Sequence, residues 1–204
     1  MFWYKQPKGW ESHLEINIRN QYHMRLLLLA ISLLCLCYPY IAMAQNITPT
    51  DIRGLIWGLP PEIVKQHEKT TFLGQEGNYL LYLDEIYGLR TTISYGFKDD
   101  KLAHVQYFMN KKYFIHQKRL DDFMMIKQGL IAQYGQPVDE DLIWRNRETQ
   151  NFPDEWGWGV YRGELFIKTY WQTSDTNIVL YLGAKTPYKP QLFVTFSPLQ
   201  SSNS

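Results

Sequence analysis

The chain has 204 residues, with 21 lysines and arginines against 20 aspartates and glutamates, and 16% of its residues are aromatic. A formal net charge of +1, with both signs interspersed, gives no electrostatic reason to expect nucleic acid or an anionic membrane surface as a partner. The high aromatic content is typical of a β-rich core or of an adhesive surface.

The first informative segment has the layout of a secretory signal peptide. Arg25 precedes an apolar run over residues 26–37, and the segment closes on Ala-Met-Ala, which is an A-x-A cleavage pattern. We therefore predict a signal peptide over 24–44, cleaved between Ala44 and Gln45. The mature protein is then periplasmic or secreted, with no stable membrane insertion after cleavage.

Residues 1–23 are polar and aromatic and precede this segment, whereas a basic n-region normally adjoins the apolar run. We interpret them as an upstream extension, with Met24 as the start of the exported protein. Two alternatives remain open. Residues 26–44 are about long enough for an uncleaved anchor, although Pro39 interrupts them. A lipoprotein is the other alternative, although the residues before Cys35 and Cys37 are leucines rather than small residues.

Cleavage leaves residues 45–204 without cysteine, so the mature chain must be stabilised by its core and has no thiol chemistry. A short strand is expected over 52–57. A helix follows, because Pro60 and Pro61 suit a first helical turn, and it ends near Glu68.

Strands are expected over 70–75 and 78–87, followed by a hairpin. Apolar residues alternate with polar ones over 89–97 and again over 103–109, and the turn Asp99-Asp100-Lys101 joins the two strands. This alternation with a period of two is the clearest strand signal in the chain.

The main helix is predicted over about 113–134. Leu120, Phe123, Ile126 and Leu130 recur at helical spacing, and the sequence Tyr134-Gly135-Gln136-Pro137 is a typical helix end. The remaining chain indicates strands, which are expected over 141–147, 157–162, 164–172, 176–184 and 191–197.

The expected fold class is α+β: an antiparallel β-sheet of about seven to nine strands with two helices packed on it. We expect a single domain over 45–204. The order of a helix followed by strands occurs in 52–110 and again in 111–198, which leaves open a division into two similar halves.

Two sequence features carry a resemblance. Arg53-Gly54-Leu55-x-Trp57-Gly58 leads into a proline-started helix, and Tyr134-Gly135-x-Pro137 ends a second helix. Together they resemble small exported bacterial proteins of unassigned function. More loosely, the chain is similar to the outer-membrane-assembly lipoprotein of the SmpA/OmlA type and to β-lactamase-inhibitor-protein-like modules. The resemblance implies a role in binding rather than in catalysis.

Motifs for catalysis and for metal binding are missing from the sequence. His67, His104 and His116 do not have metal-ligand spacing, and no nucleophile or phosphate-loop motif occurs. We predict no catalytic residue, no metal and no cofactor. Adjacent carboxylates could serve a hydrolase only if the fold brought two of them together. They stand at Asp84-Glu85, Asp99-Asp100, Asp121-Asp122, Asp139-Glu140-Asp141 and Asp154-Glu155.

The candidate binding residues are Trp156, Trp158, Asp154 and Glu155. Glycines beside tryptophans leave indole faces open, and exposed indoles bind peptides and sugars well. The alternative is that Trp156, Trp158 and Val160 alternate on one strand and all point into the core.

The sequence therefore predicts an exported, non-enzymatic binding protein whose partner is an envelope protein or a small ligand. The alternative is a cell-envelope hydrolase with a carboxylate-based site. The sequence leaves the oligomeric state undetermined.

Overall fold

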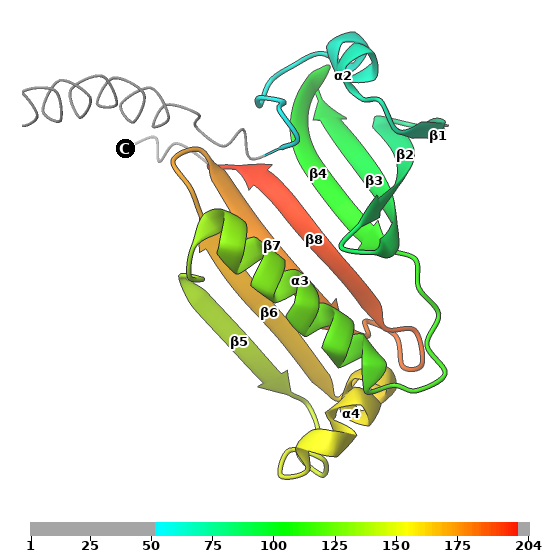
Figure 1. The fold of residues 1–204 in the computed structure, drawn as a ribbon, viewed down its shortest axis with the longest axis vertical. Coiled ribbons are helices and arrows are strands. Elements are labelled where there is room, and N and C mark those ends of the chain that lie inside the picture. The colour runs from blue at the N-terminus through cyan, green and yellow to red at the C-terminus, as the bar shows by residue number, and fades with distance from the viewer. Residues whose placement is uncertain (1–51, 200–204) are drawn as a thin grey trace, which may run out of the picture. The chain divides into compact units, whose positions relative to one another are not determined.

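The computed structural model describes residues 52–199 (Figure 1). The predicted upstream extension, the signal peptide, its cleavage site and both cysteines lie outside these residues. No helix within 52–199 has the length and the apolar character needed to cross a membrane.

Eight strands form one antiparallel sheet, in the order β1-β2-β3-β4-β8-β7-β6-β5 (Figure 1). This confirms the α+β class with an antiparallel sheet. The strands are β1 (Thr71–Glu76), β2 (Tyr79–Ile86), β3 (Leu89–Lys98), β4 (Lys101–Met109), β5 (Asp139–Trp144), β6 (Leu165–Gln172), β7 (Thr176–Gly183) and β8 (Gln191–Pro198).

Three α-helices, rather than the expected two, accompany the sheet within 52–199. They are α2 (Pro61–His67), α3 (Lys118–Tyr134) and α4 (Trp156–Arg162), and a 3-10 turn, η2 (Pro153–Glu155), precedes the last.

The sheet is built from two four-stranded meanders joined edge to edge. Strands β1–β4 follow α2, and strands β5–β8 follow α3. The last strands of the two meanders pair with each other, with Val105 opposite Phe196 and Phe108 opposite Phe193. The two meanders are called the first half and the second half below.

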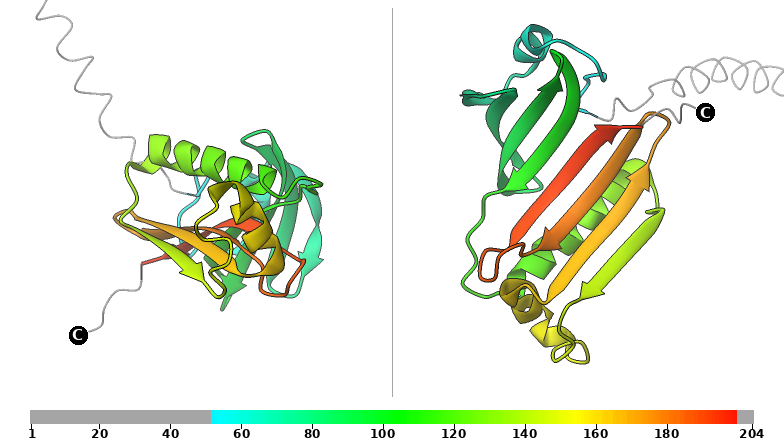
Figure 2. Two further views of the ribbon diagram at one scale, coloured as in Figure 1. Left: turned by 90° about the horizontal axis from the view of Figure 1, so that it is seen from below. Right: turned by 180° about the vertical axis from the view of Figure 1, so that it is seen from behind.

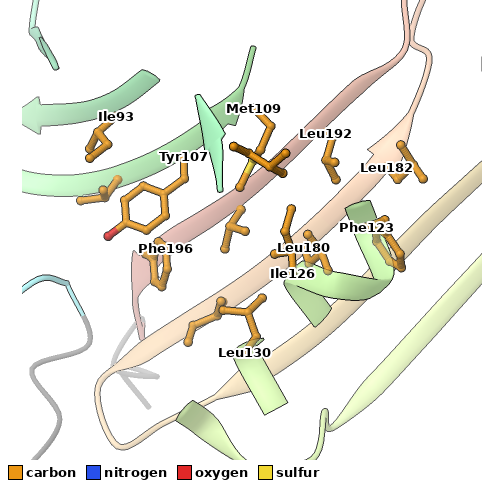
Figure 3. Packing of buried hydrophobic residues seen from close by; sticks show 14 of the residues in the cluster. Ile93, Tyr107, Met109, Phe123, Ile126, Leu130, Leu180, Leu182, Leu192 and Phe196 are labelled. Atoms are coloured by element: carbon orange, nitrogen blue, oxygen red, sulfur yellow. The ribbon is translucent and has the colours of Figure 1, made fainter. Parts of the chain in front are cut away.

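Helix α3 confirms the predicted spacing of its apolar residues. Leu120, Phe123, Ile126 and Leu130 are buried, and they belong to the same hydrophobic cluster as the inward-facing residues of β7 and β8 (Figure 3). The helix ends at Gly135, as the sequence predicted. Gly135 has a φ of 82° and a ψ of −167°, so its φ is positive but it is not in the left-handed α conformation expected of a glycine there.

The predicted start of this helix was five residues too early. The Tyr113 hydroxyl donates a hydrogen bond to Asp122 in the first turns of α3, at 2.7 Å. Residues 113–117, which precede the helix, are therefore not helical, and residues 114–117 form bends and turns.

Two predicted strands are wrong. Residues 52–57 contain only an isolated bridge between Ile52 and Leu55, because Arg53 and Gly54 both have positive φ and turn the chain. Residues 157–162 belong to helix α4, which ends at Gly163 in the left-handed conformation.

An ionic cluster in the first half of the sheet is centred on the buried side chain of Glu68, and its partners Arg53 and Asp84 are partly exposed. The Glu68 side chain is 3% exposed; it accepts a hydrogen bond from the Tyr95 hydroxyl and lies 3.2 Å from Nε of Arg53. The backbone N–H and the hydroxyl of Thr70 donate to its other oxygen. Arg53 also donates to Asp84, at 2.8 Å.

These contacts determine how Glu68 ionises. Burial alone would raise the pKa of Glu68, but the hydrogen bonds from Tyr95 and Thr70 and the charge of Arg53 outweigh it and hold the pKa below its ordinary value. Burial and the bond to Glu68 raise the pKa of Tyr95, which therefore stays a donor.

The two faces of the second half differ. Helix α3 lies over β6, β7 and β8 on one face, whereas the view from behind shows these strands in front of α3 with no helix covering them (Figures 1 and 2). We call this uncovered side the open face of the sheet.

Candidate functional site

The structure separates the four residues predicted as a binding site. Asp154 and Glu155 are exposed on η2. Trp156 is partly buried against the core and donates its indole N–H to the Gln150 carbonyl, at 3.1 Å. Trp158 is 48% exposed. The segment is therefore neither wholly core nor wholly exposed.

The reason is the helix. Residues two apart alternate onto one side of a strand, but in a helix they lie about 200° apart around the axis. Trp156 and Trp158 therefore point to different sides of α4, and the expectation that Trp156, Trp158 and Val160 share one side was wrong. Only Val160 is fully buried.

Trp158 belongs to a group of rings at the end of the second half. The His116 ring stacks on Tyr161 with centroids 3.9 Å apart and meets Trp158 edge-on at 4.2 Å, and Tyr188 contacts Tyr161. Burial and the neighbouring charge of Arg119 lower the pKa of His116, so the imidazole is neutral at neutral pH.

Two carboxylates line one cavity of about 270 Å³ between α3 and β5. Asp121 and Glu140 share it with Trp156 and Gln117. Glu140 is already engaged, because Lys127 forms an ion pair with it and Thr169 donates a hydrogen bond to it at 2.7 Å. Within 52–199, no group of three or more histidine, aspartate or glutamate side chains is arranged to hold a metal ion.

The open face carries one continuous row of cross-strand neighbours across all eight strands. From β1 to β5 in sheet order, the row is Thr71, Leu83, Thr92, Phe108, Phe193, Tyr181, Lys168 and Asp141. The central residues are neither buried nor fully exposed. The Tyr181 and Phe193 rings stack with centroids 4.7 Å apart, so an aromatic strip runs across the middle of the sheet.

A cavity of about 370 Å³ opens on this face, over β5–β8. Its floor is apolar and aromatic, and its rim is cationic. The residues that line it are Ile143, Arg145, Phe166, Lys168, Tyr181, Lys185, Gln191 and Phe193.

Gly183 explains why the floor has this shape. A Cβ atom at this position would lie 2.6 Å from the Phe166 ring and 2.7 Å from the Tyr181 hydroxyl oxygen. The two rings can lean over the end of β7 only because no side chain stands there.

Within residues 52–199, no carboxylate forms an ion pair with the cations around the cavity. The Arg145 guanidinium lies 4.4 Å from the centroid of the Phe166 ring, and none of the ion pairs within 52–199 involves Arg145, Lys168 or Lys185. The neighbouring carboxylates bind other side chains. Asp141 lies opposite Lys168 in the sheet, and Glu164 accepts a backbone hydrogen bond from Arg145. Asp141 accepts from the Tyr170 hydroxyl at 2.9 Å, and Glu164 accepts two hydrogen bonds from Arg162.

Comparison with known proteins adds no relative. No protein-family model matches the chain, and neither a curated protein sequence nor a solved structure is significantly similar to it.

The amino-acid sequence contains a signal for the open face in strands β7 and β8. In strands with one face in water, apolar and polar residues alternate cleanly. In β7 and β8, however, Tyr181 and Phe193 stand at the positions where polar residues are expected. Near-continuous apolar runs of this kind indicate that the second face also makes contacts.

Proposed function

We propose that the protein is an exported, non-enzymatic binding protein that holds an envelope protein on the open face of its sheet. The observation that carries the proposal is the row of residues across all eight strands, with Phe108, Phe193 and Tyr181 at its centre. In this proposal α3 is the support packed on the opposite face, and α2 supports the first half.

Physical reasoning supports the open face as the contact surface. An uncovered face of an antiparallel sheet is normally polar, because it faces water. Aromatic residues are enriched at the centres of protein interfaces, where rigid rings cover a large area at a small cost in conformational entropy. The row on the open face has the same arrangement, with aromatic residues at its centre and with Thr92 and Lys168 on either side of them.

The proposed compartment comes from the sequence. The basic residue, apolar run and small residues over 24–44 are the layout of an export signal. The resemblance to envelope-assembly and inhibitor-like proteins likewise implies binding. A partner in the envelope is therefore the simplest one that the protein would meet.

Affinity capture from the envelope fraction tests this function. Phe108→Ser combined with Phe193→Ser should abolish recovery of the partner while the variant stays folded. Phe114→Ser is the matched control, because Phe114 is 97% exposed and lies in the connection between β4 and α3, outside the sheet. If the control loses the partner and the double variant retains it, the contact surface is not the open face.

The second candidate function is a carbohydrate hydrolase. It is favoured by one observation, the pair Asp121 and Glu140 in a cavity that also exposes Trp156. Two carboxyl groups facing one cavity are what glycoside hydrolysis requires, although the ion pair of Glu140 with Lys127 opposes a role as general acid. Asp121→Asn should abolish hydrolysis of envelope glycans if this candidate is correct, and should leave partner capture unchanged if it is not.

A further inference from the structure

The geometry points to a ligand site in the cavity over β5–β8 that takes an oxyanion attached to a flat apolar body, such as an aromatic carboxylate. This inference concerns a small ligand and does not depend on the protein partner proposed above.

The rim of the cavity supplies donors and positive charge but no carboxylate. Arg145, Lys168 and Lys185 carry charge, and the amide of Gln191 adds further hydrogen-bonding capacity. Among the side-chain hydrogen bonds within 52–199, none involves the Tyr181 hydroxyl or the side chains of these three cations. Hydrogen bonds between charged donors and an anionic acceptor are roughly twice as strong as neutral ones, so an oxyanion is the group best suited to this rim.

Tyr181 remains a donor under ordinary conditions. Burial raises the pKa of its hydroxyl, and the opposing effect of the nearby Arg145 charge is smaller. The hydroxyl therefore stays protonated at neutral pH and does not add a negative charge to the cavity.

The apolar floor of the cavity determines which kind of molecule can carry the oxyanion. The Phe166, Tyr181 and Phe193 rings and Ile143 provide an apolar surface, and Gly183 leaves the space over which two of the rings lean. Flat rings pack on such surfaces in offset-stacked or edge-on arrangements. The volume of about 370 Å³ is within the usual range for small-molecule sites, which begins near 300 Å³.

Direct titration of the purified protein with matched probes tests the inference. The probe is 2-naphthoate. Its controls are 2-naphthylmethylamine, which has the same ring system with a cationic head, and inorganic phosphate, which has an anionic head without a ring. Calorimetry should show one site for 2-naphthoate and affinities at least tenfold weaker for both controls. Binding should also weaken as salt is added, because the contributing charges lie at the surface.

Substitution of the rim locates the site. Lys168→Gln combined with Lys185→Gln should weaken 2-naphthoate binding at least tenfold, and Tyr181→Ala should weaken it by removing part of the floor. Lys101→Gln is the matched control, because Lys101 is an exposed lysine at the first residue of β4, in the first half. Thermal melting of each variant separates loss of binding from loss of fold, and Lys185→Gln alone, outside the strands, covers the case in which the double variant unfolds.

The inference is overturned if 2-naphthoate and 2-naphthylmethylamine bind equally well, if neither binds, or if the rim variants bind 2-naphthoate as tightly as the Lys101→Gln control. Partner capture by the same rim variants is a separate readout. If the rim variants lose 2-naphthoate binding and still capture the partner, the small-ligand site is supported separately from the proposed protein partner.

Discussion

In each half of the sheet a helix precedes four antiparallel strands, but the second half also contains α4, and the two halves fill their buried faces differently. In the second half, α3 contributes a long apolar stripe that includes Leu120, Phe123 and Ile126. In the first half, α2 buries only Val64, and the space beneath the strands holds the ionic cluster of Glu68 and Arg53. Both halves therefore have an apolar core, and the first half adds a satisfied charge network to it.

This difference predicts how each half responds to perturbation. Apolar packing does not depend on protonation, whereas a carboxylate held by hydrogen bonds does. Four experiments test the comparison, and they are arranged from the largest expected effect to the smallest.

Ile126→Asp tests the hydrocarbon support of the second half. Ile126 is fully buried, so the variant would bury an unpaired carboxylate and lower the free energy of unfolding by about 4 kcal/mol. Lys118→Asp is the control. Lys118 is exposed at the start of α3, where a negative charge suits the helix dipole, so the change should be about 0.5 kcal/mol or less. Equal losses in chemical denaturation would contradict the assigned buried side of α3.

Trp156→Ala and Trp158→Ala test α4, the element of the second half that has no counterpart in the first. Trp156 packs on the core, so its truncation should cost about 3 kcal/mol of stability. Trp158 is half-exposed, and its truncation should cost about 1 kcal/mol or less. Loss of partner recovery with Trp158→Ala at near-normal stability would place the contact site on α4 rather than on the open face.

Glu68→Gln tests the ionic support of the first half. The substitution removes the charge that Tyr95, Thr70 and Arg53 stabilise, and it should cost about 2 kcal/mol at neutral pH.

The dependence on pH has a definite sign. Because the pKa of Glu68 is lower in the folded than in the unfolded protein, its stabilisation is complete above the ordinary value of 4.5 and is lost as the pH falls through the folded-state value. The difference between wild type and Glu68→Gln in urea denaturation should therefore shrink in acid. A difference that stays constant from pH 7 to about pH 3 would show that the charge of Glu68 is not responsible.

Substitution of Gly183 in the second half and of Gly96 in the first half compares how tightly the two halves are packed on the open face. A Cβ atom at Gly183 would lie too close to the buried Phe166 ring. Gly183→Ala should therefore lower the free energy of unfolding by about 1–2 kcal/mol. A Cβ at Gly96 would meet the ring edge of Tyr79, which is 46% exposed and can move aside. Gly96→Ala should cost about 0.5 kcal/mol. The melting temperatures of the two variants measure this difference, and a larger loss for Gly96→Ala would contradict it.

Prediction from the sequence succeeded where one periodicity dominated. The hairpin of β3 and β4, the buried side of α3 and the helix end at Gly135 are confirmed. It failed at Trp156–Arg162, because the sequence W-G-W-G-V has a period of two whether or not it is a strand. Contacts with residues distant in sequence stabilise the helix in this segment. One of them is a hydrogen bond from the backbone N–H of Gly157 to the side-chain oxygen of Gln117.

The cavity could not be predicted from local patterns. Its cations come from Arg145 after β5, Lys168 in β6 and Lys185 after β7. Each looks like an ordinary solvated lysine or arginine in the sequence. Their convergence follows from the order of strands in the sheet, and no residue spacing encodes that order.

The position of β8 has a consequence for the order of events during synthesis. This strand is the last of the eight in sequence, yet it lies in the middle of the sheet, between β4 and β7. The ribosome must therefore synthesise the chain as far as Pro198 before β8 can pair with both β4 and β7 and so join the two meanders. Until then β4 and β7 each present an unpaired edge, which is the state in which chains aggregate or are captured by chaperones. The sheet within 52–199 is completed only by β8, so the two meanders stay separate until that strand has been made.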